Sequence, residues 1–496
     1  MAHTSVATVS GLDKVRKAKA MTTTQRIGLG LGPALGLLLY WLMPKEGIGH
    51  AGLAVMACTV VMAVYWITEA LPLAVTALIP LFLLPISGGA SIDVVAPAYG
   101  NPVVFMYMGG FVLALAIQKW NLHRRIALTI IDAVGTASHR IVLGIILATS
   151  FLTLFISNSA TALMMLPVAL ALIAEIRAKN ILDESDAQRF AKCILLAVAY
   201  SATIGGLATL VAAVPNALLS GIAREQLGHT VTFAQWLAFA GPISLLLLAF
   251  LYFYLTRFAF PVKQERPGAS ELVKDEKRRL GPMSVEEKTV GIAFLATACL
   301  WVFKSMIGLG YVHDAAISMV ATVALFVLPA RQGSERILEW DDMKELPWGI
   351  LVLFGGGLAL AASFSDAGVN SWLGESLGFL KDFSGLMIIA LLTLIVLAMT
   401  EVLSNTAVSN LVLPLCVGLG VAIGMDPLML MAAAALAAGS CFMLPVATPP
   451  NTAVYSAGEL AVKDMARAGL WLNILAMTVI TLAVYYWLPL TLGTAR

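Results

Sequence analysis

Charge is scarce in this chain of 496 residues, because Asp, Glu, Lys and Arg together make up only 12% of it. A soluble globular domain has about 25% charged residues, so a soluble fold of this length is excluded. Hydrophobic residues account for 59% of the sequence, and the mean hydropathy is +0.89. These values indicate a polytopic membrane protein with many spans. The formal net charge of +2 gives no reason to expect a nucleic-acid partner.

Cysteine and histidine are rare as well, with five and six copies. The cysteines lie in apolar runs and lack metal-ligand spacing, so we expect small buried side chains and no disulfide framework. The histidines lie in loops or at interfaces, no HExxH motif occurs, and the motif serines described below have no nearby base other than Glu401. An intramembrane enzyme needs such a base or a metal constellation, so we do not expect an enzyme.

Apolar runs of membrane-spanning length recur along the whole chain. Two further apolar stretches, residues 141–178 and 387–424, could each hold two short helices but contain a polar phrase at the centre. We interpret each as a re-entrant hairpin that returns to the side it entered from, which requires protein or water to cover the broken backbone. The eleven predicted spans lie at residues 27–43, 51–68, 71–87, 103–118, 193–222, 236–256, 289–308, 314–330, 347–364, 428–457 and 469–490.

The distribution of Lys and Arg predicts the orientation. With the N-terminus inside, 26 of the 31 Lys and Arg residues fall in inner segments, as the positive-inside rule requires. A hairpin that crossed the membrane would move every later loop to the other side and remove this asymmetry. We therefore predict a multi-pass protein of the inner cell membrane, surrounded by lipid, with a cytoplasmic N-terminus and a C-terminus outside.

Three phrases recur in the same order on both sides of a charged linker. The first is MYMGGFVLALAI and VLFGGGLALAAS, the second is SNSATALMMLP and SNTAVSNLVLP, and the third is GLATLVAAVPNAL and FMLPVATPPNTAV. Ordered recurrence of this kind indicates an internal duplication. Because five spans separate the two copies, the hairpins open to opposite sides and the repeats are inverted.

The duplication divides the chain into four predicted segments. Each repeat contains one re-entrant hairpin and one broken helix, at 193–222 in the first repeat and at 428–457 in the second. The segments are the cytoplasmic N-terminus with the first transmembrane helix (1–50), the first inverted repeat (51–262), a charged cytoplasmic linker (263–288) and the second inverted repeat (289–496).

Interrupted apolar segments at matching positions of inverted repeats are typical of secondary transporters with a site near the membrane midplane. Helix packing could explain one isolated Ser-Asn pair, but four interruptions in matched pairs favour a site. Ser, Asn and Thr cap helices, and the N–H groups exposed at a break hold anions. Carbonyl, Asn and Thr oxygens suit Na⁺. A channel is the rival, yet hairpins entering from both faces fit alternating access better.

These motifs resemble the divalent anion/sodium symporter family over nearly the whole chain, through the paired Ser-Asn tips, the TPPN break at 448–451 and the order of spans. The resemblance implies an all-α polytopic membrane protein with 11 transmembrane helices plus two re-entrant hairpins in inverted repeats. It further implies a homodimer in which a scaffold domain holds a transport domain that moves as an elevator.

The resemblance also implies transport of a small dianion of the C4-dicarboxylate class, such as succinate, malate or fumarate. Na⁺ would be the coupling ion, and no other cofactor is implied. Two alternatives stay open, namely Na⁺-independent exchange of dicarboxylates or tricarboxylates, and sodium-sulfate symport.

Site residues follow from the same resemblance. The first Na⁺ site would use Thr153, Ser157, Asn158 and backbone near Gly206, and the second would use Thr400, Ser404, Asn405 and backbone at Ala447. The substrate carboxylates would meet Asn158, Ser159, Asn405, Thr406, Thr448 and Pro449.

Three residues leave the chemistry of the site open. Ser159 stands where the family usually has Thr and should slightly enlarge the pocket, and Val214 makes the first break more apolar than usual. Glu401 lies deep in an apolar segment, where an ionisable group counts as functional by default. A carboxylate that accepts backbone N–H groups at the hairpin tip and only orders it would explain Glu401 equally well.

Overall fold

The structure is a computed structural model that describes residues 21–44, 46–135, 137–179, 181–261, 277–331 and 333–493. Within these ranges the chain is helical, apart from a single bridge between Pro329 and Arg336, which confirms the predicted all-α class. Most of the N-terminal segment that is predicted to be cytoplasmic, and the first part of the charged linker, lie outside the described residues.

Some helices of the first half begin at a polar side chain that caps them, as Asn101 does before α6 and Thr232 does before α12. In order, the elements of this half are α1 (Thr23–Leu42), α2 (Gly49–Thr68), α3 (Leu73–Thr76), α4 (Pro80–Ser87), α5 (Ile92–Val95), η1 (Ala96–Gly100), α6 (Pro102–Lys119), α7 (Leu122–Val134), α8 (Ser138–Thr153), α9 (Asn158–Ala178), α10 (Glu184–Leu207), α11 (Val214–Leu227), α12 (Phe233–Tyr254) and η2 (Leu255–Ala259).

The second half repeats this plan after the linker, and Ser284 caps its first long helix. Its elements are α14 (Val285–Phe303), α15 (Asp314–Val327), η3 (Trp340–Glu345), α16 (Trp348–Asp366), α17 (Val369–Ser376), η4 (Gly378–Asp382), α18 (Gly385–Val402), α19 (Asn405–Ile423), α20 (Pro427–Ala438), α21 (Pro449–Tyr455), α22 (Val462–Leu482), η5 (Ala483–Trp487) and α23 (Leu488–Leu492).

Nine helical segments among the described residues are long and apolar enough to cross a membrane. They include α9, α18 and α19, which belong to the two predicted hairpins, whereas α8, α15 and α20 are shorter than a full span. Length and composition do not distinguish a re-entrant helix from a spanning one. The chain is therefore a polytopic membrane protein, and the count of eleven spans plus two hairpins stays a prediction.

All four predicted interruptions are helix breaks in the structure. The chain turns at 154–157 between α8 and α9, and at 403–404 between α18 and α19. The two broken helices are interrupted at 208–213, between α10 and α11, and at 439–448, between α20 and α21. Each polar motif thus lies at a point where the regular hydrogen bonding of a helix is interrupted.

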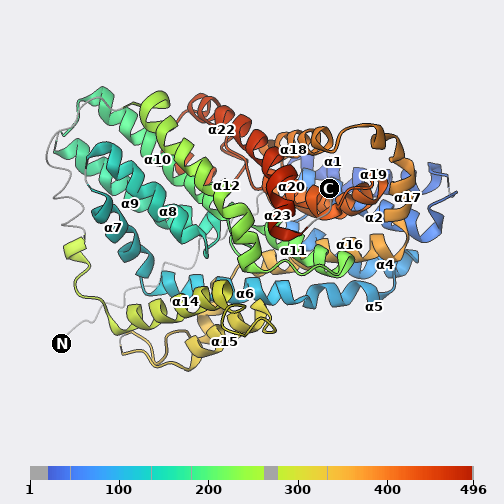
Figure 1. Cartoon of the computed structure of the whole chain (residues 1–496), viewed down its shortest axis with the longest axis horizontal. Coiled ribbons are helices and arrows are strands. Elements are labelled where there is room, and N and C mark those ends of the chain that lie inside the picture. Colours follow the sequence, from blue (N-terminus) through green and yellow to red (C-terminus); the bar gives the residue numbers. More distant parts are fainter. Residues whose placement is uncertain are drawn as a thin grey trace, which may run out of the picture.

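The two halves are interlocked by a crossed packing of the half-helices. α11, which follows the first break, packs against α19 and α20 of the second half. α21, which follows the second break, packs against α9 and α10 of the first half. In Figure 1 α8, α9 and α10 lie at the left and α17 at the right, with α11 and α20 between them. Each hairpin therefore contacts the broken helix of the other half.

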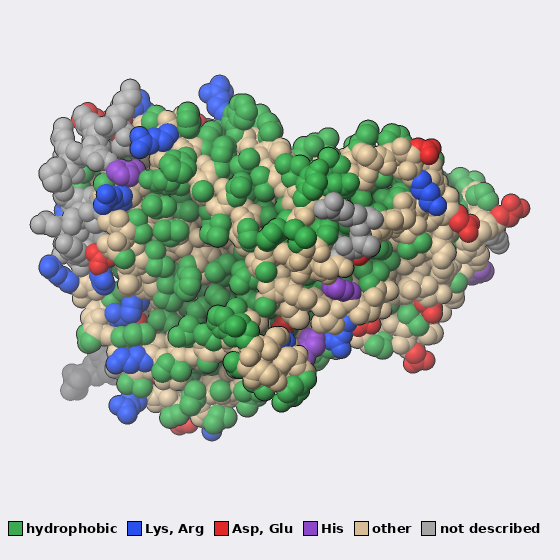
Figure 2. Space-filling view, viewed as in Figure 1, with side chains coloured by type: hydrophobic (Ala, Val, Ile, Leu, Met, Phe, Trp, Pro, Cys, Tyr) green, Lys and Arg blue, Asp and Glu red, His purple; other side chains and the backbone are tan. Residues whose placement is uncertain are grey.

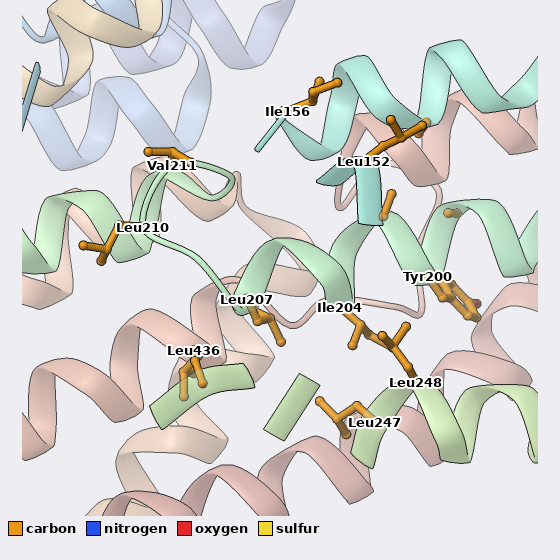
Figure 3. Close-up of a cluster of buried hydrophobic side chains, with 14 of the residues drawn as sticks. Leu152, Ile156, Tyr200, Ile204, Leu207, Leu210, Val211, Leu247, Leu248 and Leu436 are labelled. Carbon is orange, nitrogen blue, oxygen red and sulfur yellow. The ribbon is translucent and has the colours of Figure 1, made fainter. Parts of the chain in front are cut away.

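A continuous hydrophobic core supports the first hairpin and its break. Figure 3 shows Ile204 of α10 beside Leu248 of α12, with Leu152 and Ile156 of the hairpin above them and Tyr200 to the right. These side chains are buried, and they belong to a core that extends into α20 and α22. The core holds the tip of the hairpin against the interrupted end of α10.

Charged side chains separate to the two ends of the molecule. In Figure 2 Lys and Arg gather at the left end of the view and Asp and Glu predominate at the right end, with exposed hydrophobic side chains between them. Exposed apolar side chains over the middle of the molecule are expected for a protein surrounded by lipid.

One expectation about the cysteines is wrong. Cys58, Cys193, Cys416 and Cys441 are buried, as predicted, but Cys299 is exposed. Cys299 lies on α14, which runs along the edge of the molecule in Figure 1. A helix at the edge turns one face away from the core, and apolar surroundings in the sequence do not tell which face a residue occupies.

Candidate functional site

The first Ser-Asn motif begins helix α9. Ser157 is the N-cap residue, and its hydroxyl accepts a hydrogen bond from the Ala160 N–H at 3.4 Å. Asn158 follows as the first helical residue, and its Oδ1 is buried without a hydrogen-bond partner among the described residues. One turn earlier, the Thr153 hydroxyl donates to the Thr149 carbonyl at 2.5 Å. These oxygens form the first group of candidate cation ligands.

Gly206 allows the Asn158 amide to approach the end of α10. A Cβ atom at position 206 would lie 2.0 Å from Asn158 Oδ1, so no larger residue fits without a shift of the amide. Nearby, the Thr209 hydroxyl donates to the Leu154 carbonyl at 2.6 Å and joins the break to the hairpin turn. The structure thus brings Asn158 and Gly206 together, as the resemblance implies.

The second motif has the same plan with different partners. The Thr400 hydroxyl lies 2.9 Å from two acceptors, Asn405 Oδ1 and the Ala438 carbonyl. Cys441 Sγ lies 3.1 Å from the same Asn405 oxygen. Ser404 holds the N-cap position of α19 but makes no capping hydrogen bond. Thr400 and Asn405 are therefore brought together, beside the start of the 439–448 break.

Glu401, on α18 of the second hairpin, joins the hairpin to the 439–448 break through hydrogen bonds. Its carboxylate accepts hydrogen bonds from the backbone N–H groups of Phe442 at 2.9 Å, Met443 at 3.1 Å and Leu444 at 3.2 Å. The Asn473 amide of α22 donates to it at 2.6 Å. The carboxylate accepts N–H groups as the ordering interpretation predicts, but they belong to the 439–448 break and not to the hairpin tip.

Thr448 begins the short helix α21 as its N-cap and accepts from the Asn451 N–H at 3.3 Å. Pro449 and Pro450 occupy the first helical positions, as predicted for residues that lack an amide donor. Because α21 packs against α9, this helix start lies in the crossed packing beside the first hairpin. Ala447 is buried just before it.

The remaining substrate-binding candidates lie one residue after each motif asparagine. Ser159 and Thr406 are both half-buried, as are Asn158 and Asn405. The tips are therefore neither sealed in the core nor fully open.

Two asparagines that brace the breaks were missed by the sequence analysis. Asn216 donates to the carbonyls of Gly206 at 3.2 Å, Leu207 at 3.1 Å and Thr209 at 2.8 Å. Asn451 donates to the Leu444 carbonyl at 3.0 Å. The signal was present, because each asparagine follows a proline in the third repeated phrase.

A cavity of about 630 Å³ lies beside α9, the helix that begins with the first motif. One wall is the corner between α6 and α7, with His123 and Arg124, and the other is the face of α9 from Ala160 to Glu175. Burial lowers the pKa of His123 from its ordinary value of 6.5, which favours the neutral imidazole at neutral pH. The cavity reaches within two residues of Asn158 along the chain.

Known proteins resemble the chain over almost its full length. The family model described as the sodium:sulfate symporter transmembrane region matches residues 33–492. The sodium-dependent dicarboxylate transporter SdcS of Staphylococcus saprophyticus is 40% identical over 491 residues, which cover 96% of this chain and 94% of that protein. SdcS of Staphylococcus aureus strain MRSA252 is also 40% identical, and covers 97% of this chain and 94% of its own.

Solved structures share the fold at low sequence identity. The YdaH transporter of Alcanivorax borkumensis superposes with a TM-score of 0.56 at 13% identity, covering 95% of this chain and 99% of that one. MtrF of Neisseria gonorrhoeae superposes with a TM-score of 0.53 at 11% identity, covering 91% and 97%. At these identities the likeness concerns the fold alone.

Proposed function

Because the chain belongs to the sodium:sulfate symporter family, which is the divalent anion/sodium symporter family that its motifs resemble, we propose that it carries C4-dicarboxylates across the membrane together with Na⁺. The observation that carries the proposal is the pair of Ser-Asn hairpin tips, each folded onto a helix break. Relatives 40% identical over the whole chain are named sodium-dependent dicarboxylate transporters, which favours dicarboxylate over sulfate.

Two Na⁺ ions would bind through neutral oxygens. The first site takes Thr153, Ser157 and Asn158 with backbone near Gly206, and its support is the partnerless oxygen of Asn158. The second takes Thr400, Ser404 and Asn405 with backbone at Ala447. Hydroxyl, amide and carbonyl oxygens are hard ligands, and interrupted helices of transporters coordinate Na⁺ with such groups.

The substrate would lie between the two tips, against Asn158, Ser159, Asn405 and Thr406, with Thr448 and Pro449 at its side. None of these residues is positively charged. A dianion moved out of water into such a site lacks a counter-charge, and this is costly. The two Na⁺ ions supply that charge, which gives a physical reason for coupling because the anion binds well only when the cations are present.

The proposed transport cycle is an alternating-access movement of elevator type in a homodimer. The crossed packing would move both hairpins and both broken helices together as the transport domain, against a scaffold built from the remaining helices. The cavity beside His123 and Arg124 would be the route from the cytoplasmic side to the first tip, and its support is that its lining reaches Ala160 near the start of α9. This arrangement has eleven spans and two re-entrant hairpins, with the N-terminus inside.

Uptake of labelled succinate into proteoliposomes tests the proposal. An inward Na⁺ gradient should drive saturable uptake, and both Asn158→Ala and Asn405→Ala should reduce it at least tenfold while the proteins stay folded. Gradient-independent uptake would instead indicate anion exchange, and competition by sulfate but not malate would indicate sulfate symport. Full transport by either asparagine variant would contradict the site.

A further inference from the structure

The two motif asparagines differ in what their side-chain oxygens contact. Asn158 Oδ1 is buried and has no hydrogen-bond partner among the described residues. Asn405 Oδ1 lies 2.9 Å from the Thr400 hydroxyl and 3.1 Å from Cys441 Sγ. An oxygen that accepts no hydrogen bond can bind a cation directly. An oxygen that already accepts hydrogen bonds must lose them before a cation can bind.

The thiol has no counterpart in the first repeat. Gly206 occupies the corresponding place against Asn158, and it contributes no side chain. Cys441 is fully buried beside Asn405, at the start of the 439–448 break. The second cation site thus contains a side chain that the first site lacks.

The Thr400 hydroxyl can release Asn405 without losing a hydrogen bond. A hydroxyl has one proton, and the Ala438 carbonyl lies at the same 2.9 Å distance as Asn405 Oδ1. When the proton turns to Ala438, the Thr400 oxygen can face a cation. The Thr400 hydroxyl therefore becomes a ligand of the cation and does not compete with it for Asn405 Oδ1.

The thiol of Cys441 behaves differently. Its S–H is a weak donor toward the same Asn405 oxygen, so a cation bound there displaces it. A thiol is also a soft ligand, which suits copper or zinc and not a hard cation such as Na⁺. When Na⁺ binds Asn405 Oδ1, Cys441 therefore loses its hydrogen bond and does not coordinate the ion.

We propose that Cys441 is an affinity-determining residue of the second Na⁺ site, where its thiol competes with the cation for Asn405 Oδ1. The inference rests on the proposed function, since it concerns the coupling ion of that function. It makes the site at Asn158 the tighter of the two and the first to fill, and it makes the site at Asn405 the weaker.

The test measures the Na⁺ concentration that gives half-maximal succinate uptake in proteoliposomes of the full chain. Cys441→Ala removes the donor and should lower that concentration about threefold or more. Cys441→Ser replaces the soft thiol with a hydroxyl, whose hard oxygen can turn toward the ion, and should lower it as well. Cys416→Ala, which changes another buried cysteine on α19, should leave it within twofold of the parent.

The midpoint of thermal unfolding, measured at increasing Na⁺ concentrations, gives a second readout that does not depend on transport. The parent and the Cys441 variants should rank in Na⁺ affinity as they do in the uptake assay. It also shows whether each variant folds, and Cys441→Ser carries the test if Cys441→Ala does not fold. Equal half-maximal concentrations for the parent and the folded Cys441 variants would overturn the inference while leaving Na⁺ coupling intact. A parent protein without any Na⁺ response would instead overturn the proposed function.

Discussion

Single residues hold the two helix breaks in different ways. At the first break the Thr209 hydroxyl meets the Leu154 carbonyl, and at the second the Glu401 carboxylate meets three successive backbone N–H groups. A carboxylate has two oxygens that accept and none that donates, so it matches a run of N–H groups. One buried side chain therefore satisfies three successive N–H groups of the second break.

Glu401→Gln should destabilise the protein, because the amide keeps one accepting oxygen and turns an NH₂ group toward backbone donors. Buried N–H groups left without a partner cost about 1–3 kcal/mol. We expect a lower midpoint of thermal unfolding, measured in detergent with a thiol-independent fluorescence readout. Glu375→Gln, at an exposed glutamate on α17, is the control. Equal midpoints for both variants would contradict a stabilising role of Glu401.

At the scale of elements, the crossed packing is reinforced by ion pairs between the halves. Arg177 at the end of α9 pairs with Glu459 in the connection between α21 and α22, with N–O distances of 2.6 and 2.9 Å. Lys192 of α10 pairs with Asp464 of α22 at 2.8 Å. Both pairs join the first hairpin or its broken helix to the region that follows the second break.

The Glu459 pair predicts a pH dependence of stability. The Arg177 guanidinium lowers the pKa of Glu459 below its ordinary value of 4.5 in the folded protein. The stabilisation is therefore complete above that ordinary value and is lost as the pH falls through the lower, folded value. For a partly exposed pair we expect at most about 1 kcal/mol.

Thermal unfolding of Glu459→Gln at several pH values measures this effect. The variant should unfold slightly below the parent at pH 7, and the difference should shrink below pH 4.5 as Glu459 of the parent becomes protonated. Glu375→Gln again serves as the control. A difference that grew toward low pH would show that the pair does not act through the carboxylate charge.

At the scale of the whole molecule, the separation of charges predicts which end faces the cytoplasm. The basic end holds α7 with the cavity beside Arg124, and the opposite end holds α17 with the exposed Glu375. Cytoplasmic segments of membrane proteins hold the excess of Lys and Arg. The cavity should therefore open to the cytoplasm and Glu375 should lie outside.

Thiol labelling with a membrane-impermeant reagent checks this orientation in a Cys299→Ala background, which removes the exposed cysteine. Leu163→Cys, on the α9 wall of the cavity, should react in inside-out vesicles only. Glu375→Cys should react in right-side-out vesicles only. The opposite pattern for both positions would reverse the predicted topology.

Composition and local motifs were enough to predict the membrane class, the all-helical fold and the four helix interruptions. In lipid an apolar chain satisfies its backbone as helices, so a polar phrase within an apolar run is visible locally as a break. The caps at Ser157 and Thr448 agree with the general preference of Ser and Thr for helix N-termini.

Only the tertiary structure decided which groups meet across the breaks. Glu401 contacts Asn473, 72 positions away, and Cys441 contacts Asn405, 36 positions away. Such contacts depend on how α20, α21 and α22 pack around the second hairpin, and residue types alone do not specify that packing. The repeated phrases made the two cation sites look equivalent, whereas the fold makes them different, because it places a thiol beside Asn405 and bare glycine backbone beside Asn158.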